Sequence, residues 1–155
     1  MKVVLTLVLV FAIHTCTTSV RTESSDIVGN WKVKVTFKDG SERTLILNAQ
    51  PSGKAFLKIG EPRSNMVEPA EPTAGHWELG DGNTVSLSCK VDFPVGNFGR
   101  EQGTMVFKGT FESADVLTGD LAFYPMDQNP KDPKAAPSRT GTFRATRVSA
   151  DDAQR

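Results

Sequence analysis

The feature that most constrains the fold is an alternation of apolar and polar residues. Segment 26–37 shows it first, because Trp31, Val33, Val35 and Phe37 alternate there with lysine and threonine. A period of two places the apolar side chains on one face of a β-strand and the polar ones on the other. The segment therefore predicts a strand with one buried face.

Further segments repeat the alternation, and the apolar positions assigned to the inward face are odd-numbered throughout. They are 41–50, 54–60, 75–79, 84–93, 104–112, 117–124 and 141–148. About eight short strands in succession are typical of an antiparallel up-and-down barrel or of two stacked sheets. Because the shared parity means that no strand needs to change sheets, it favours an all-β, eight-stranded meander barrel over residues 26–148.

The first turn can be tested for register. A two-residue Asp-Gly loop would place Trp31 opposite Asn48, with a polar group on the core side. A three-residue loop, 38–40, with Gly40 in the left-handed conformation places Trp31 opposite Leu47 instead. The second register pairs apolar with apolar side chains, so we expect the three-residue loop.

The two ends of the chain differ from this pattern. Residues 1–19 contain one cation, an apolar run at 3–13 and then small polar residues. Such a run is too short to span a bilayer and is typical of a secretory signal peptide, which predicts a secreted or periplasmic protein. A lipid anchor at Cys16 is the alternative. We expect residues 149–155 to form a disordered tail.

Composition limits the class of protein. The 155 residues are 38% hydrophobic and 23% charged, which suits one globular domain. Without residues 1–19, 17 basic and 18 acidic residues remain, so electrostatics give no reason to expect a nucleic-acid partner. Cys89 is then the single cysteine, so no intrachain disulfide is expected and the core must hold the fold.

The closing strand of such a barrel lies beside the first and brings Arg147 to Trp31. Gly29-Asn30-Trp31 together with Arg147 resembles the lipocalin and wider calycin-like families. The ending 141–148 is also similar to secreted bacterial lipocalin-like domains of uncharacterised role and, less closely, to avidins. The resemblance implies a structural plug at the closed end, with Gly29 beside Trp31 and the Arg147 guanidinium over the indole.

The chain also departs from these families. The helix after the last strand, the long first loop and the disulfides of lipocalins are missing, and the polar biotin-binding constellation of avidins is not found. The resemblance therefore brings no cofactor.

Few residues suggest catalysis. Outside 1–19, His76 is the only histidine, whereas nucleophilic pairs and most zinc sites need a histidine beside a nucleophile or several ligands together. His76 has the outward parity, and Cys89 has the inward parity of an inert buried thiol. We expect no metal site and no enzyme activity, with an enzyme that uses a loop carboxylate as the remaining alternative.

Long loops suggest where binding occurs. In a meander barrel, connections alternate between the ends, so loops 61–73, 94–103 and 125–139 emerge at one end. Such a layout is typical of a binding mouth, although neutral insertions would produce it too.

Two functions fit this layout. One is the binding of a small, mainly apolar molecule, and the other is a non-catalytic cell-envelope interaction or inhibitor module with a solid core that docks a protein partner through its loops. Aromatic residues at this end are either ligand contacts or ordinary core. The candidate ligand contacts are Phe93, Phe98, Phe107, Phe123, Tyr124 and Met126.

Overall fold

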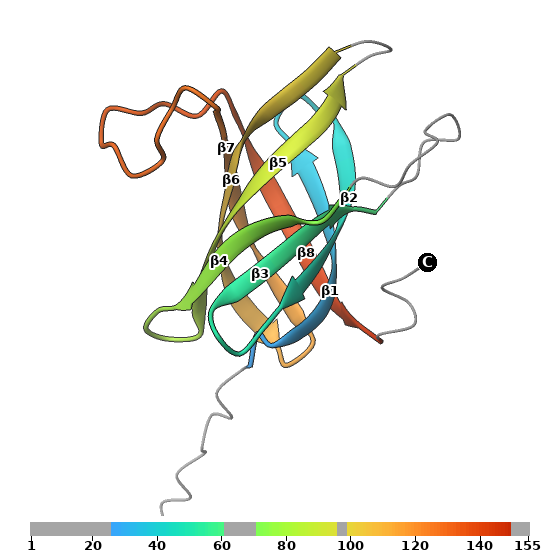
Figure 1. Cartoon of the computed structure of the whole chain (residues 1–155). Helices are drawn as coiled ribbons and strands as arrows, with labels where there is room; N and C mark the ends of the chain where they lie inside the picture. The colour runs from blue at the N-terminus through green and yellow to red at the C-terminus, as the bar shows by residue number, and fades with distance from the viewer. Residues whose placement is uncertain (1–25, 61–70, 96–98, 150–155) are drawn as a thin grey trace, which may run out of the picture.

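A computed structural model describes residues 26–60, 71–95 and 99–149. They form a closed antiparallel barrel of eight strands in sequence order (Figure 1). The strands are β1 (Gly29–Phe37), β2 (Glu42–Ala49), β3 (Lys54–Ile59), β4 (Thr73–Leu79), β5 (Thr84–Val95), β6 (Gly99–Ser113), β7 (Val116–Pro125) and β8 (Arg139–Val148). The prediction of an all-β up-and-down barrel is confirmed.

The parity prediction holds throughout the core. Every buried apolar side chain, from Ile27 to Ala145, has an odd number. The register at the first turn is also the expected one, since Trp31 pairs with Leu47 and Gly40 has a φ of 81°. Each connection therefore returns the chain to the next strand with the same face inward.

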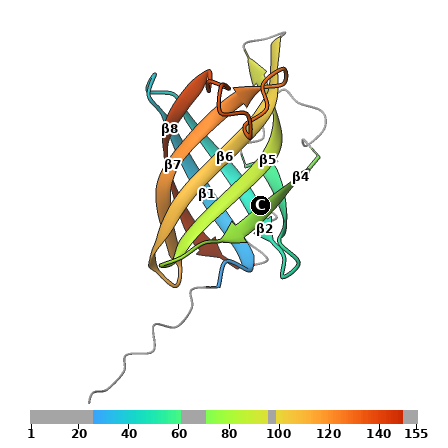
Figure 2. The ribbon, with the colours of Figure 1, turned by 90° about the vertical axis from the view of Figure 1, so that its left-hand side faces the viewer.

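Closure comes from β1 and β8, which lie side by side (Figure 2). Short turns join β2 to β3, β4 to β5 and β6 to β7 at one end of the barrel, which we call the closed end. The other connections leave from the opposite, long-loop end. The predicted signal peptide, residues 61–70 of the first predicted loop and residues 150–155 of the predicted tail lie outside the described residues. The part of the chain that the structure describes contains no helix long and apolar enough to cross a membrane.

One predicted loop is wrong. Residues 94–103 were expected to be open, but β5 and β6 stay paired from Val91–Gly103 to Val95–Gly99 and extend past the rim as a hairpin (Figure 1). The Lys90 carbonyl points away from β6, because it accepts a hydrogen bond from β4. Pro94 lies four positions further along the strand, so its backbone groups also point away from β6. The N–H that proline lacks would therefore not have bonded to β6, and the β5–β6 ladder is intact.

Candidate functional site

Three of the predicted contact residues lie inside the barrel. Phe93 and Phe123 are buried and pack with ring centroids 6.2 Å apart. Phe107 packs edge-on against Phe143 at 5.2 Å. These rings fill the interior and hold one another in place, which is core packing.

The other three predicted residues do not join them. Tyr124 is half-buried on the outward parity of β7, and Met126 is 77% exposed just after that strand. Phe98 lies outside the described residues. The structure therefore does not bring the described candidates together into one site.

The closed end is built around Trp31, whose side chain is fully buried. The guanidinium carbon of Arg147 lies 4.4 Å from the centroid of its ring. Arg147 also donates to the carbonyls of Val28 at 2.7 Å and Asp26 at 2.6 Å, and to the carboxylate of Asp115 at 3.1 Å. The arrangement is the one that the lipocalin-like resemblance implies.

Gly29 allows this close approach. Its φ is 138°, and a Cβ built there would lie 2.6 Å from a terminal guanidinium nitrogen of Arg147. The indole N–H of Trp31 donates to the Ile27 carbonyl at 2.7 Å, so the ring keeps its hydrogen bond while buried.

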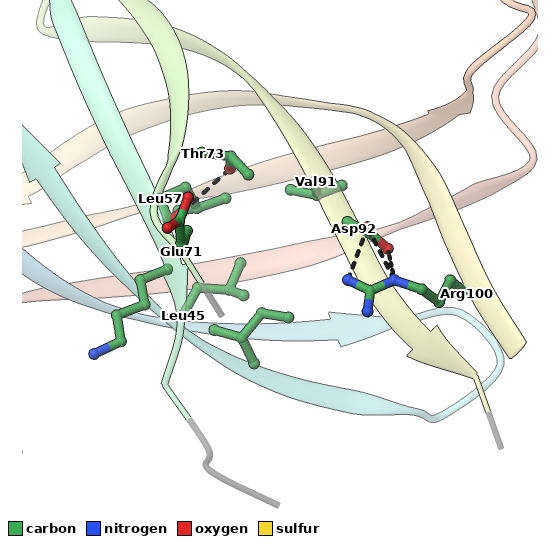
Figure 3. A pocket seen from close by; sticks show the side chains of 9 residues that line it. Leu45, Leu57, Glu71, Thr73, Val91, Asp92 and Arg100 are labelled. Carbon is green, nitrogen blue, oxygen red and sulfur yellow. Dashed lines mark hydrogen bonds and ion pairs between the residues drawn. The ribbon is translucent and has the colours of Figure 1, made fainter. Parts of the chain in front are cut away.

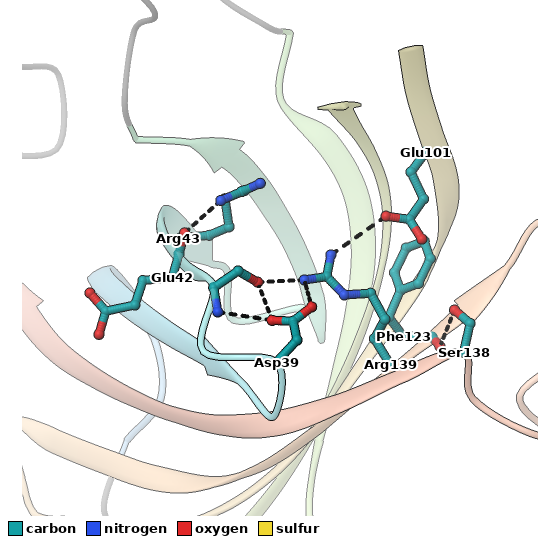
Figure 4. Close-up of polar contacts among 8 residues, drawn as sticks. Asp39, Glu42, Arg43, Glu101, Phe123, Ser138 and Arg139 are labelled. Carbon is teal, nitrogen blue, oxygen red and sulfur yellow. Dashed lines mark hydrogen bonds and ion pairs between the residues drawn. The ribbon is translucent and has the colours of Figure 1, made fainter. Parts of the chain in front are cut away.

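The long-loop end carries a second arginine over an aromatic ring. Figure 4 shows the polar contacts of this arginine, Arg139, with Asp39 and Glu101. The guanidinium carbon of Arg139 lies 3.8 Å from the centroid of Phe37. The same group contacts the Asp39 carboxylate at 2.8 Å, the Ser41 hydroxyl at 2.5 Å and the Glu101 carboxylate at 3.6 Å. Hydrogen bonds from Ser41, and then Arg139, lower the pKa of Asp39 to about 2. The axial end where a mouth was expected therefore carries an anchored guanidinium.

Sequence reasoning missed this cluster, although a signal for it exists. Arg139 precedes Arg147 by eight residues and shares its inward parity. A strand advances about 3.3 Å per residue, so the two arginines lie roughly 26 Å apart along β8, at opposite ends of the barrel.

A pocket of about 320 Å³ opens in the wall of the barrel near the long-loop end (Figure 3). Strands β2 to β6 and the residues just before β4 contribute to it. Its lining residues are Leu45, Leu57, Lys58, Ile59, Glu71, Thr73, Val91, Asp92 and Arg100. We call it the lateral pocket. It lies at the predicted end, but none of the six predicted contact residues lines it.

The wall opens there because β4 begins late. Pairing of β4 with β3 starts at Thr73 and Leu57, and its pairing with β5 starts only at Gly75 and Cys89. Pro72, the residue before β4, has no N–H with which to extend either ladder. The Thr73 hydroxyl takes the place of strand pairing, since it contacts the carbonyls of Leu57 and Lys90.

The floor of the lateral pocket is apolar. Leu45, Leu57 and Val91 face the barrel interior and are at most 6% exposed. Ile59 is half-buried and packs against this core. Such a surface favours a hydrocarbon group over water.

The rim of the lateral pocket is charged. Arg100 Nε donates to both oxygens of Asp92, at 2.9 and 3.0 Å, and Gln102 donates to one of them at 2.9 Å. These bonds lower the pKa of Asp92, with Arg100 as the largest cause. Lys58 and Glu71 complete the rim, and neither has an ion-pair partner among the described residues.

The remaining chemistry-bearing residues lie elsewhere. Burial raises the pKa of the Cys89 thiol to about 12, so it stays protonated at neutral pH. His76 is exposed and lies 3.3 Å from Glu78. Within the described ranges, no three His, Cys, Asp or Glu residues are grouped so that they could hold a metal ion.

No protein-family model matches the sequence, and no curated protein sequence matches it. The solved structures that are similar to the chain include two at 15% identity over 79% of it. One is a redesigned β-barrel, with 91% of that chain covered and a TM-score of 0.46. The other is EF1p2_mFAP2b bound to DFHBI, with 93% covered and a TM-score of 0.47. At these values neither similarity bears on what this chain binds.

Proposed function

We propose that the protein is a non-catalytic barrel that binds a small, mainly apolar molecule in the lateral pocket. The observation that carries this proposal is the apolar floor of Leu45, Leu57 and Val91, reached through the wall just before β4 begins. The volume of about 320 Å³ falls at the lower end of the range for small-molecule pockets, about 300–1,000 Å³. Each methylene of a ligand that is buried there contributes about 0.8 kcal/mol to the free energy of binding.

Entry through the wall is favoured over entry along the axis. A ligand at either end would have to displace Arg139 from Phe37 or Arg147 from Trp31. Entry through the lateral pocket leaves both contacts in place. The loops of the long-loop end then surround the site without forming an axial mouth.

The proposed location is the periplasm or the cell exterior. The apolar run within residues 1–19 and the resemblance to secreted lipocalin-like domains support it. Signal-peptide cleavage followed by mass spectrometry of the exported chain tests this location, and a chain retaining residues 1–19 in the cytoplasm contradicts it.

Binding is tested by filling the lateral pocket. Ile59→Trp places a larger side chain in it, and Ile46→Trp is the matched control, a half-buried isoleucine on neighbouring β2 that does not line the pocket. Calorimetric titration with straight-chain alcohols of six to eight carbons should show at least about tenfold weaker binding to the first variant, because it loses several buried methylenes. Binding to the second should equal that of the parent protein. No alcohol binding, or equal loss in both variants, contradicts the proposal.

A second candidate is a cell-envelope interaction module that uses its loops. The long connection between β7 and β8 is held in place by the backbone bonds from Gln128 to Pro125 and from Ser138 to Phe123, each 2.9 Å long. It exposes Lys131 and Lys134. An ordered, exposed loop favours docking, because little conformational entropy is lost on binding. Lys131→Glu with Lys134→Glu should then abolish association with envelope fractions at an unchanged melting temperature, and unaltered association contradicts this candidate.

A further inference from the structure

The rim of the lateral pocket carries two charges of opposite sign, Lys58 and Glu71, that no described residue neutralises. Asp92 is already satisfied by Arg100 and Gln102. Lys58 and Glu71 line the same pocket without an ion-pair partner among the described residues. The residues that line the pocket therefore include one lysine and one glutamate beside the apolar floor.

The register explains how these two charges come to the same rim. Lys58 follows Leu57 on β3, and Glu71 comes two residues before Thr73, the residue that pairs with Leu57 at the start of β4. Figure 3 shows Glu71 beside Thr73 and Leu57, across the pocket from the Asp92–Arg100 ion pair. Both charges thus lie on the β3–β4 side.

Charge complementarity then selects the ligand. A ligand with only a carboxylate would bring like charge toward Glu71, and one with only an ammonium would bring like charge toward Lys58. A ligand with both groups can pair with both side chains through charge-assisted hydrogen bonds. The apolar floor meanwhile requires an aliphatic body.

Size limits that body. A volume of about 320 Å³ corresponds to roughly ten water molecules at about 30 Å³ each. A ligand of on the order of ten non-hydrogen atoms fits, and a long acyl chain does not.

We infer that the lateral pocket takes a small aliphatic zwitterion, the chemical class of amino acids with aliphatic side chains. This inference rests on the proposed function, because it names the ligand class of the same pocket. It goes beyond an apolar ligand in assigning Lys58 to the carboxylate and Glu71 to the ammonium.

Four probes that share one side chain test the assignment by calorimetry: leucine, leucine methyl ester, N-acetyl-leucine and N-acetyl-leucine methyl ester. They carry both charges, the positive charge, the negative charge and neither. Leucine should bind the parent protein at least about fivefold more tightly than any of the others, consistent with the gain from charge-assisted bonds.

The side chains are tested against the same probes. Lys58→Gln should remove the preference for leucine over its methyl ester, and Glu71→Gln should remove the preference for leucine over N-acetyl-leucine. Lys54→Gln and Glu78→Gln are the controls, because they alter exposed charges on the same two strands outside the pocket. Both controls should keep the full preference.

The outcomes separate the two proposals. If all four probes bind equally, or if the preference survives both Lys58→Gln and Glu71→Gln, the assignment of a zwitterion is wrong while an apolar pocket stands. If neither these probes nor the alcohols bind, the proposed function fails and the inference falls with it.

Discussion

The two ends of the barrel use the same contact in different surroundings. At the closed end Arg147 lies over Trp31, and at the long-loop end Arg139 lies over Phe37. Strand β8 supplies both arginines and β1 supplies both rings. One pair of adjacent strands thus covers the core at both ends.

The hydrogen-bond acceptors make the difference. The arginine at the closed end donates to the backbone carbonyls of Asp26 and Val28, which are fixed by the chain path. The arginine at the long-loop end is held by the carboxylates of Asp39 and Glu101, which water can solvate when they are unpaired. The contact at the closed end is therefore needed for stability, whereas the long-loop end tolerates the loss of its arginine.

The largest effect is expected from Arg147→Ala. It removes the cation from the fully buried ring of Trp31 and leaves the carbonyls of Asp26 and Val28 without donors. We expect a loss of about 2–4 kcal/mol in the free energy of unfolding. Urea denaturation followed by Trp fluorescence measures it, and a loss under about 1 kcal/mol would show that the contact at the closed end is not needed.

Two glycines offer a second comparison of the ends. Gly29→Ala forces a Cβ to within 2.6 Å of Arg147 at a φ of 138°, whereas Gly40→Ala meets nothing within 4 Å at a φ of 81°. We expect a loss of about 2–3 kcal/mol for the first and about 1 kcal/mol for the second. Thermal denaturation of both variants checks the order, and equal losses contradict the role of Gly29 in admitting Arg147.

Much of this fold was predictable because its signals are local. The odd parity and the turn at Gly40 define the inward face of each strand and the register of β1 on β2. The contact between Arg147 and Trp31 followed from closing the barrel. These features depend on strand period and strand count, which a sequence displays directly.

The lateral pocket was not predictable in the same way. It depends on how far β4 extends relative to β3 and β5, and strand ends are set by competition between neighbouring ladders. Pro94 suggested a break where β5 continues, because the side of the strand that its missing N–H faces cannot be read from sequence. Pro72 carries the same signal in the sequence, and the wall of the barrel opens beside it at the lateral pocket.

A smaller effect is expected from Arg139→Ala. The variant loses the cation over Phe37, while Asp39 and Glu101 remain exposed or half-buried and can turn to water. We expect a loss of about 1 kcal/mol. Urea denaturation of the Arg139→Ala and Arg147→Ala variants in parallel compares their losses in the free energy of unfolding. Equal losses would remove the distinction between the two ends.

The smallest effect is a pH dependence at the long-loop end. The pKa of Asp39 is lowered to about 2 in the folded protein, whereas that of an aspartate in an unfolded chain is about 3.9. A carboxyl whose pKa is lowered by folding stabilises the fold above about pH 4, and this contribution is lost as the pH falls through about 2.

The destabilisation caused by Arg139→Ala should therefore shrink between pH 5 and pH 2.5, because the parent protein loses part of the same contact. The destabilisation caused by Arg147→Ala should change less, since the backbone carbonyls of Asp26 and Val28 to which Arg147 donates do not titrate. Urea midpoints of the three proteins across this range measure both differences. If the two differences change with pH in parallel, the carboxylates around Arg139 do not distinguish the long-loop end from the closed end.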